Sequence, residues 1–170
     1  MKILLAVDGS PCSDRAIEEI ASRPWPAGSE IKVLTAFEQP LPPTPAAWAI
    51  PPDYLEELDR ATSKNAGLIV ERAISKLRAV MGPEANIKGE SVPGPPRIVI
   101  LEEAANWGAD LIAVGSHGYR AWERFLLGSV SQSIVSHAKC SVEVVRCPPK
   151  AAVLQRLTWA KEKDRQLWPR

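Results

Sequence analysis

Residues 108–131 are GADLIAVGSHGYRAWERFLLGSVS, and the order of features in this stretch decides the fold class. The short apolar run at 110–114 has the composition of a strand buried on both faces, as in a parallel sheet. A loop with glycines follows from Gly115, and beyond Gly128 the apolar residues recur at helical spacing. A strand, a glycine loop and a helix in this order predict one unit of a parallel α/β sheet.

The rest of the 170-residue chain repeats this alternation. Strands are expected at residues 2–7, 31–37, 86–92, 110–114 and 141–146. Strands that alternate with helices predict right-handed crossovers, and hence an α/β fold with an open, doubly wound, five-stranded parallel sheet and helices on both faces. Ligands of such sheets bind beyond the carboxyl ends of the strands. The loops expected at that edge are 8–11, 37–52, 93–96 and 115–128.

Local signals predict the ends of the helices. Ser10 suits the N-cap and Pro11 the first turn of the first helix. Asp53 suits the cap of a long helix that stops by Gly82, and Gly108 suits the C-cap of the next helix. The apolar face of that next helix is expected to consist of Ile98, Leu101, Ala104 and Ala105.

The strongest motif is Gly115-Ser116-His117-Gly118, nine further residues, and then Gly128-Ser129-Val130-Ser131. Glycines let backbone N–H groups approach a ligand closely. The start of a helix adds unpaired N–H groups and the positive end of the helix dipole, and the two serines add hydroxyl donors. Together these features predict a phosphate site. From the residues alone, the glycines could also be plain turn residues and Ser129 a helix cap.

The pattern G-x2-G-x9-G-[ST] resembles the nucleotide-binding motif of the universal stress protein family, in its ATP-binding branch. KILLAVDGS at 2–10, GADLIAVGSHG at 108–118, LLGSVS at 126–131 and VEVV at 142–145 are similar to the family's corresponding segments. The resemblance covers a domain at residues 1–147 and leaves 148–170 as a basic amphipathic extension. It implies a five-stranded sheet of order 3-2-1-4-5.

The resemblance also implies the site. Its nucleotide-binding positions correspond to Ala6, Val7, Asp8, Ala36, Gly115, Ser116, His117, Gly118, Gly128, Ser129, Val130 and Ser131. Members of this branch often bind ATP with Mg²⁺ or Mn²⁺, and some hydrolyse it slowly. This chain departs from many relatives at Ala121, where they carry glycine, and at Ala36, where a larger aliphatic residue is common. Base fit, and with it the choice of ATP over another adenine nucleotide, therefore stays open.

Two residues of the site allow a structural as well as a functional interpretation. Asp8 could bind ribose or a metal, or it could only form an Asx cap for the first helix. His117 could donate to a phosphate or only pack over the strand end, and no neighbouring carboxylate in the sequence would orient it as a base. No catalytic residue is assigned, and the sequence contains no G-x4-G-K-[ST] loop.

Composition and charge limit the remaining possibilities. The net charge of +1 does not indicate nucleic-acid binding, and no segment is long and apolar enough to span a membrane. Without a secretory signal pattern at the start, a cytoplasmic protein is expected. The three cysteines, Cys12, Cys140 and Cys147, lack a C-x-x-C pattern and are expected to be reduced structural thiols.

Three functional interpretations remain open on this sequence. The first is an ATP-binding stress-response protein that acts as a nucleotide-dependent switch or partner-binding module, with a protein partner that the sequence does not name. The second is a slow metal-dependent ATPase, and the third is a dimeric scaffold with a degenerate pocket. The family resemblance also implies a homodimer paired through the last strand, since that strand is an open sheet edge. The basic extension could dock on its own domain, a second subunit, a partner or a membrane.

Overall fold

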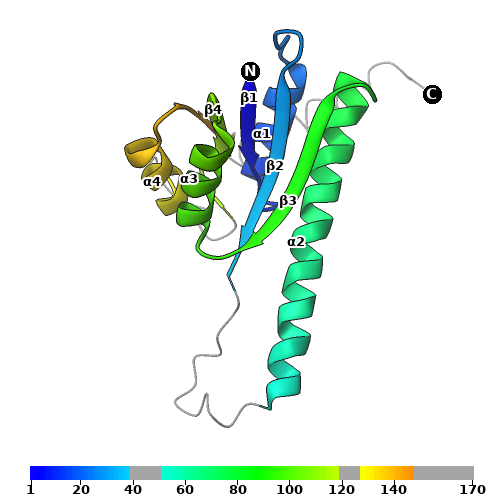
Figure 1. The fold of residues 1–170 in the computed structure, drawn as a ribbon, viewed down its shortest axis with the longest axis vertical. Helices are drawn as coiled ribbons and strands as arrows, with labels where there is room; N and C mark the ends of the chain where they lie inside the picture. Colours follow the sequence, from blue (N-terminus) through cyan, green and yellow to red (C-terminus); the bar gives the residue numbers. More distant parts are fainter. Residues whose placement is uncertain (39–50, 119–126, 148–170) are drawn as a thin grey trace, which may run out of the picture.

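The protein forms one five-stranded sheet between two helical layers (Figure 1), as seen in a computed structural model that describes residues 1–38, 51–118 and 127–147. The elements follow one another as β1 (Lys2–Ala6), α1 (Pro11–Ser22), β2 (Glu30–Phe37), α2 (Pro52–Met81), β3 (Asn86–Pro93), α3 (Pro96–Trp107), β4 (Leu111–Gly115), α4 (Ser129–His137) and β5 (Ser141–Val145). All strands pair in parallel in the order β3-β2-β1-β4-β5. The expected fold class and strand order are confirmed.

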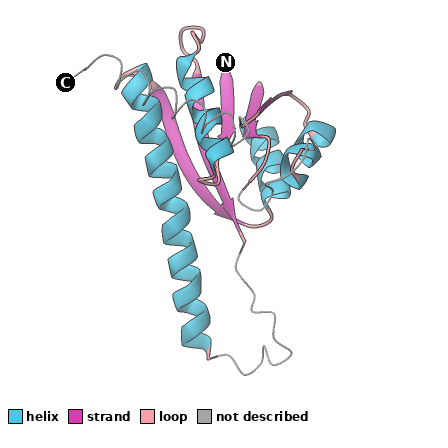
Figure 2. Cartoon of the chain, turned by 180° about the vertical axis from the view of Figure 1, so that it is seen from behind, coloured by secondary structure: helices cyan, strands magenta, loops and turns pink. Residues whose placement is uncertain are grey.

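The strand order reverses at β1, which pairs with β2 on one side and β4 on the other. The two helical layers cover opposite faces of the sheet (Figure 2). Alternate residues of β1 serve the two layers: Ile3 and Leu5 pack with α1 and α2, whereas Leu4 and Ala6 pack with α3 and α4. Because Ile3, Leu4, Leu5 and Ala6 are all buried, the strand beyond Lys2 has no polar side chain, and the first polar residue at its carboxyl end is Asp8.

Most expected helix boundaries are confirmed. Ser10 caps α1, since its hydroxyl accepts the Ser13 N–H at 3.2 Å, and Gly108 ends α3 in the left-handed conformation with φ 69°. Asp53 does not cap α2, because the helix already begins at Pro52 and Asp53 lies in its first turn. A proline at the start of a helix needs no N–H acceptor, so the helix begins two residues before the Tyr54 start that an Asp53 cap would give.

The buried face of α3 also differs from the expectation. Its buried residues are Val99, Ile100 and Ala104, whereas Ile98 is 44% exposed. Seven of the twelve residues are apolar and lie almost all round the helix, so helical spacing alone does not select the buried face. This rotation turns Ile100 toward the carboxyl edge of the sheet.

Cys12 and Cys147 form a disulfide, with their Cα atoms 5.0 Å apart. The expectation that both are reduced thiols is therefore wrong for this pair, while Cys140 is free as expected. The two cysteines are 135 positions apart in sequence, and only the parallel topology brings the end of β5 to the start of α1. No sequence spacing signals such a pairing.

Among the helices that the structure describes, none is both long and apolar enough to cross a bilayer.

Candidate functional site

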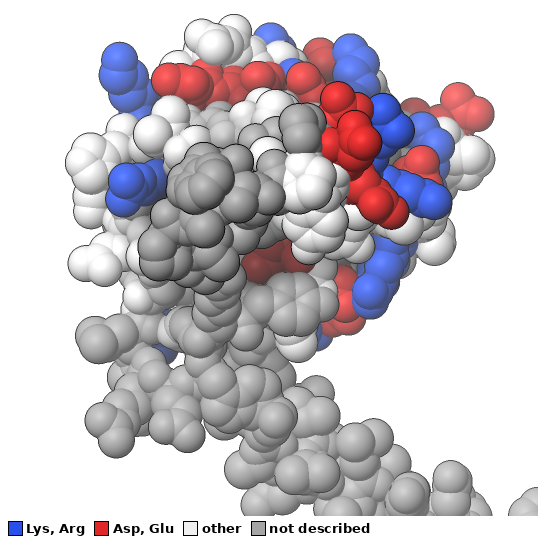
Figure 3. Space-filling view, turned by 90° about the horizontal axis from the view of Figure 1, so that it is seen from below, with Lys and Arg blue, Asp and Glu red and all other residues white. Residues whose placement is uncertain are grey.

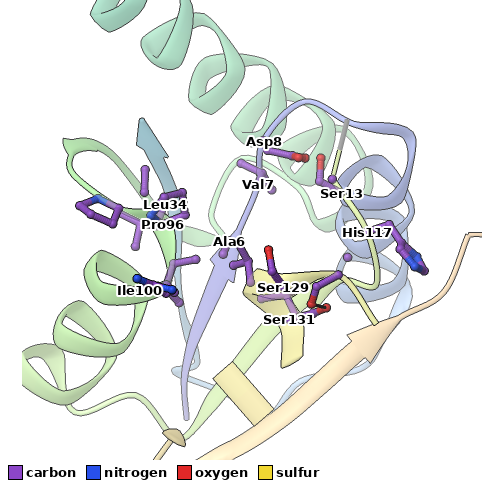
Figure 4. A pocket seen from close by; sticks show the side chains of 18 of the residues that line it. Ala6, Val7, Asp8, Ser13, Leu34, Pro96, Ile100, His117, Ser129 and Ser131 are labelled. Carbon is purple, nitrogen blue, oxygen red and sulfur yellow. Dashed lines mark hydrogen bonds between the residues drawn. The ribbon is translucent and has the colours of Figure 1, made fainter. Parts of the chain in front are cut away.

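A cavity of about 600 Å³ lies at the carboxyl edge of the sheet, where the strand order reverses (Figure 4). This volume is within the range of small-molecule sites. Six parts of the chain contribute its walls: the ends of β1, β2 and β4, and the starts of α1, α3 and α4. The position is the one at which open α/β sheets bind their ligands.

The expected site residues come together in this cavity, with one exception. Those that line it are Ala6, Val7, Asp8, Ala36, Gly115, His117, Gly118, Gly128, Ser129, Val130 and Ser131. Ser116 does not line it, because its side chain is 2% exposed and faces the Cys12 Sγ at 4.0 Å. The assignment of these residues to a nucleotide remains a prediction.

Ser116 instead holds the two ends of the glycine loop together. Its carbonyl oxygen accepts the Gly128 N–H at 2.8 Å and the Ser131 hydroxyl at 3.0 Å. Its own N–H donates to the Val145 oxygen of β5 at 2.8 Å. Two of the amides expected to hold a phosphate, those of Ser116 and Gly128, are thus already paired within the protein. The Ser131 hydroxyl is likewise engaged as a donor.

The first turn of α4 supplies the remaining donors. The first helical hydrogen bond of α4 runs from the Gln132 N–H to the Gly128 oxygen at 2.9 Å. The N–H groups of Ser129, Val130 and Ser131 precede it, so the helix itself offers them no acceptor. All three residues line the cavity. An anion placed there would meet several donors and the positive end of a helix dipole.

Gly118 lies close to Asp8 across the cavity mouth. A Cβ at Gly118 would lie 2.7 Å from the Asp8 Oδ2, closer than real Cβ contacts come. The other carboxylate oxygen, Oδ1, accepts the Ser10 N–H at 3.0 Å. One carboxylate oxygen therefore fixes the turn before α1, as the structural interpretation expects, and the other faces the glycine loop. Binding of ribose or a metal by Asp8 stays a prediction.

Gly115 is required by close packing behind the loop. A Cβ there would lie 2.8 Å from the Cys12 carbonyl carbon and 2.9 Å from the Ser13 backbone nitrogen. These are backbone atoms, which cannot rotate away. The loop can therefore follow β4 directly only because residue 115 has no side chain.

His117 lies at the rim of the cavity, with its ring directed away from the centre (Figure 4). Its Nδ1 is 3.1 Å from the Ser116 hydroxyl oxygen. A hydroxyl does not orient an imidazole as a carboxylate does, so the arrangement favours a positioning role over general-base catalysis.

Sequence reasoning missed the wall opposite α4. The residues of this wall are Leu34 and Glu38 from the end of β2, and Pro95, Pro96, Arg97 and Ile100 around the start of α3. Figure 4 shows Leu34, Pro96 and Ile100 gathered on one side, with Asp8, Ser129 and Ser131 on the other. On this side Leu34, Pro96 and Ile100 form an apolar surface, to which Glu38 and Arg97 add one charged side chain of each sign, whereas the α4 side is polar. The loop at 93–96 was expected at this edge of the sheet, and this expectation was the signal in the sequence that could have predicted the wall.

The face of the molecule seen from the carboxyl side carries acidic and basic side chains next to each other on its described part (Figure 3). A binding surface for nucleic acid needs basic side chains gathered along one face. The mixed charges seen here do not have that form.

Comparison with known proteins identifies the family. The model of the universal stress protein family matches residues 1–146. The chain belongs to the universal stress protein family. A universal stress protein of Thermus aquaticus is 34% identical over 149 residues, which cover 85% of this chain and 97% of that protein. Universal stress protein YxiE of Bacillus subtilis is 28% identical over 150 residues, 85% and 98% of the two chains.

Solved structures of the family share the fold. UspA from Lactobacillus plantarum superposes with a TM-score of 0.70 at 28% identity, covering 86% of this chain and 97% of that one. An Arabidopsis thaliana family member solved with AMP bound has a TM-score of 0.58 at 21% identity, covering 89% and 94%. Family structures with cAMP and, from Archaeoglobus fulgidus, with dAMP give TM-scores of 0.62 and 0.56 at 21% and 20% identity. Three of these related structures therefore hold an adenine nucleotide, namely AMP, cAMP or dAMP.

Proposed function

We propose that this universal stress protein belongs to the ATP-binding branch and acts as a nucleotide-dependent stress-response switch or partner-binding module. The observation that carries the proposal is the cavity at the reversal point, apolar at one end and bordered by the first turn of α4 at the other. That polarity matches an adenine base joined to phosphates. The nucleotides bound by related structures support the same class of ligand.

Each end of the nucleotide would meet a different part of the cavity. The base would lie against Leu34, Ala36 and Ile100, which are small or apolar. The phosphates would accept hydrogen bonds from the N–H groups of Ser129 and Val130. ATP is preferred to AMP in this proposal because a longer phosphate chain would meet more of the donors in the first turn of α4, the N–H groups of Ser129, Val130 and Ser131.

A divalent cation, Mg²⁺ or Mn²⁺, would depend mainly on the nucleotide for its ligands. Within the described ranges, no group of three or more His, Cys, Asp or Glu residues could hold a metal ion. The carboxylates that line the cavity are Asp8 and Glu38. Phosphate oxygens would therefore supply most ligands of a hard cation, and Asp8 would add a carboxylate oxygen.

Calorimetry with ATP, ADP, AMP and cAMP tests the proposal. We expect ATP to bind, and the Gly118→Ala variant to bind it at least about tenfold more weakly, a loss of about 1.4 kcal/mol. The added Cβ would collide with the Asp8 carboxylate at the cavity mouth. Gly67→Ala is the matched control, since a Cβ at Gly67 meets nothing within 4 Å. Absence of binding by all four nucleotides at millimolar concentration would favour the scaffold interpretation instead.

A slow ATPase is the second candidate because Asp8 and His117 both border the cavity. Neither Asp8 nor His117 has a partner that would prepare it to activate water, which favours a switch over an enzyme. Turnover faster than about one per second would reverse that preference.

We further propose a homodimer through β5. This strand is an edge of the sheet, and four of its five residues are only half-buried in the single chain. Pairing with a second copy would cover the edge. Light scattering should then give twice the 18.6 kDa mass of one chain, and a monomer mass at micromolar concentration would contradict the proposal.

A further inference from the structure

Helix α2 continues well past the carboxyl edge of the sheet (Figures 1 and 2). The turn after β1 meets α2 at Ile69, whose Cγ1 would be 3.3 Å from a Cβ at Gly9. The first buried residue of α2 is Ala66. Residues 52–65, here called the α2 arm, therefore stand beyond the sheet, over a length of about 21 Å at 1.5 Å per residue.

The α2 arm carries an apolar stripe on its surface. Tyr54 is 55% and Leu55 40% exposed, and Leu58 is half-buried one turn further on. Tyr54, Leu58 and Ala61 follow one another at steps of four and three residues, which is the spacing at which one helix packs against another. A stripe of this kind normally faces another element, because helix propensity alone stabilises a short helix only marginally in water.

The charges of the α2 arm define the kind of partner that fits. The arm has four acidic residues, Asp53, Glu56, Glu57 and Asp59, and two basic ones, Arg60 and Lys64. Arg60 pairs with Glu56 of the arm itself at 3.1 Å. A partner with apolar residues at helical spacing and an excess of positive charge would complement both features.

Residues 148–170 of the same chain, which lie outside the described residues, have this composition. They contain six basic and two acidic residues, a net charge of +4. Their apolar residues fall at helical spacing and include Val153, Leu154, Leu157 and Ala160. This segment is therefore the complement of the α2 arm in both charge and pattern.

The segment also starts within reach of the α2 arm. Cys147 is held to Cys12 at the start of α1, at the same edge of the sheet as Gly9 and hence Ile69. The path from Cys147 through the disulfide to Cys12, along the chain to Gly9 and across to Ile69 is about 20 Å long, at 3.8 Å for each step between neighbouring Cα atoms. Twenty-three residues span up to about 75 Å when extended, and about 35 Å as a helix. If about six extended residues cover the 20 Å path, the remaining residues form a helix of about 25 Å, which is long enough for the 21 Å arm.

We propose that residues 148–170 pack as an amphipathic helix along the apolar stripe of the α2 arm in the same chain. Apolar contacts with Leu55 and Leu58 would supply the stability, and the basic residues would lie next to the arm's carboxylates. The inference does not depend on nucleotide binding.

Zero-length carbodiimide coupling of the full-length protein tests the proposal. We expect amide cross-links between carboxylates of the α2 arm, such as Glu56 and Glu57, and Lys161 or Lys163. The coupling is carried out on an equal mixture of unlabelled and ¹⁵N-labelled protein that has been unfolded and refolded together, so that any dimers contain both isotopes. Cross-linked peptides that contain only one isotope show contact within a chain. Peptides of mixed isotope would assign the arm to a second copy and overturn the proposal, as would absence of arm-to-tail cross-links.

A substitution on the stripe makes the test specific. We expect Leu58→Asp to reduce the cross-links at least about fivefold and to speed amide hydrogen exchange in the arm. Val80→Asp is the control, since Val80 is 66% exposed at the other end of the same helix and should change neither result. Equal exchange of the arm in the wild type and in Leu58→Asp would also overturn the proposal. Circular dichroism confirms that both variants are folded.

Discussion

The disulfide between Cys12 and Cys147 allows a quantitative prediction of stability. The change is Cys147→Ser, chosen because Cys147 is half-buried, whereas Cys12 is packed behind Gly115 and its replacement would disturb the core as well. The two cysteines close a loop of 135 positions. In the chain-entropy model, a closed loop of this length lowers the entropy of the unfolded chain by about 17 cal/mol/K, which equals about 5 kcal/mol at 25 °C.

A loss of about 5 kcal/mol is comparable to the whole stability of many domains, for which 5–15 kcal/mol is usual. At a urea dependence of about 2 kcal/mol/M, the unfolding midpoint would fall by about 2.5 M. Urea unfolding is followed by circular dichroism without reductant, so that only the covalent link differs between the proteins.

Cys140→Ser serves as the matched control, since Cys140 is free and should leave the midpoint nearly unchanged. With reductant, the wild type and Cys147→Ser should unfold at the same urea concentration. Equal midpoints of the two proteins without reductant would refute the reasoning. So would alkylation of three thiols per chain in the unreduced, unfolded wild type.

Two further predictions concern packing and thiol reactivity. Gly89→Ala should destabilise the fold by about 1–3 kcal/mol, because its Cβ would lie 2.3 Å from the Val70 Cγ1, whereas Gly67→Ala, with free space around it, should stabilise by about 1 kcal/mol. Urea unfolding of both variants measures this, and a shift in the same direction would contradict it. Burial raises the pKa of the Cys140 thiol, so the pH at which its alkylation is half-maximal should lie above the ~8.5 of a free cysteine. A midpoint at or below that of a cysteine peptide would contradict this second prediction.

The sheet could be predicted from the sequence because its strands carry their own signals. Apolar runs such as those at β1 and β4 are too short for helices and are bounded by Gly, Asp or Pro. Their alternation with helices then leaves few topologies. The face of α3 could not be predicted, because a helix with apolar residues on several sides is oriented by its neighbours and not by its own pattern.

The α4 wall of the candidate site could be predicted from the sequence, and the family resemblance added Ala36 and the end of β1, but the rest of the opposite wall could not be predicted. The α4 side is one continuous strand–loop–helix unit, so its residues are neighbours in sequence as well as in space. The opposite wall combines Leu34 of β2 with Pro96 and Ile100 of α3, which are more than sixty positions away. Residues of this kind have no common motif, and only the sheet order places them side by side. The same holds for Cys12 and Cys147.

The hydrogen bonds around Ser116 bear on how the site would work. The Gly128 N–H and the Ser131 hydroxyl both donate to the Ser116 oxygen. These two bonds fix the positions of Ser116 and Gly128 relative to each other. The Ser10 hydroxyl adds a contact of 3.4 Å to the His117 oxygen, which links the same loop to the turn that caps α1. A donor group held in place before the ligand arrives loses little entropy on binding. The internally paired amides of Ser116 and Gly128 would therefore not donate to a ligand themselves. Their bonds would instead keep the first turn of α4 in place, and the amides of that turn would be the ones to meet an anion.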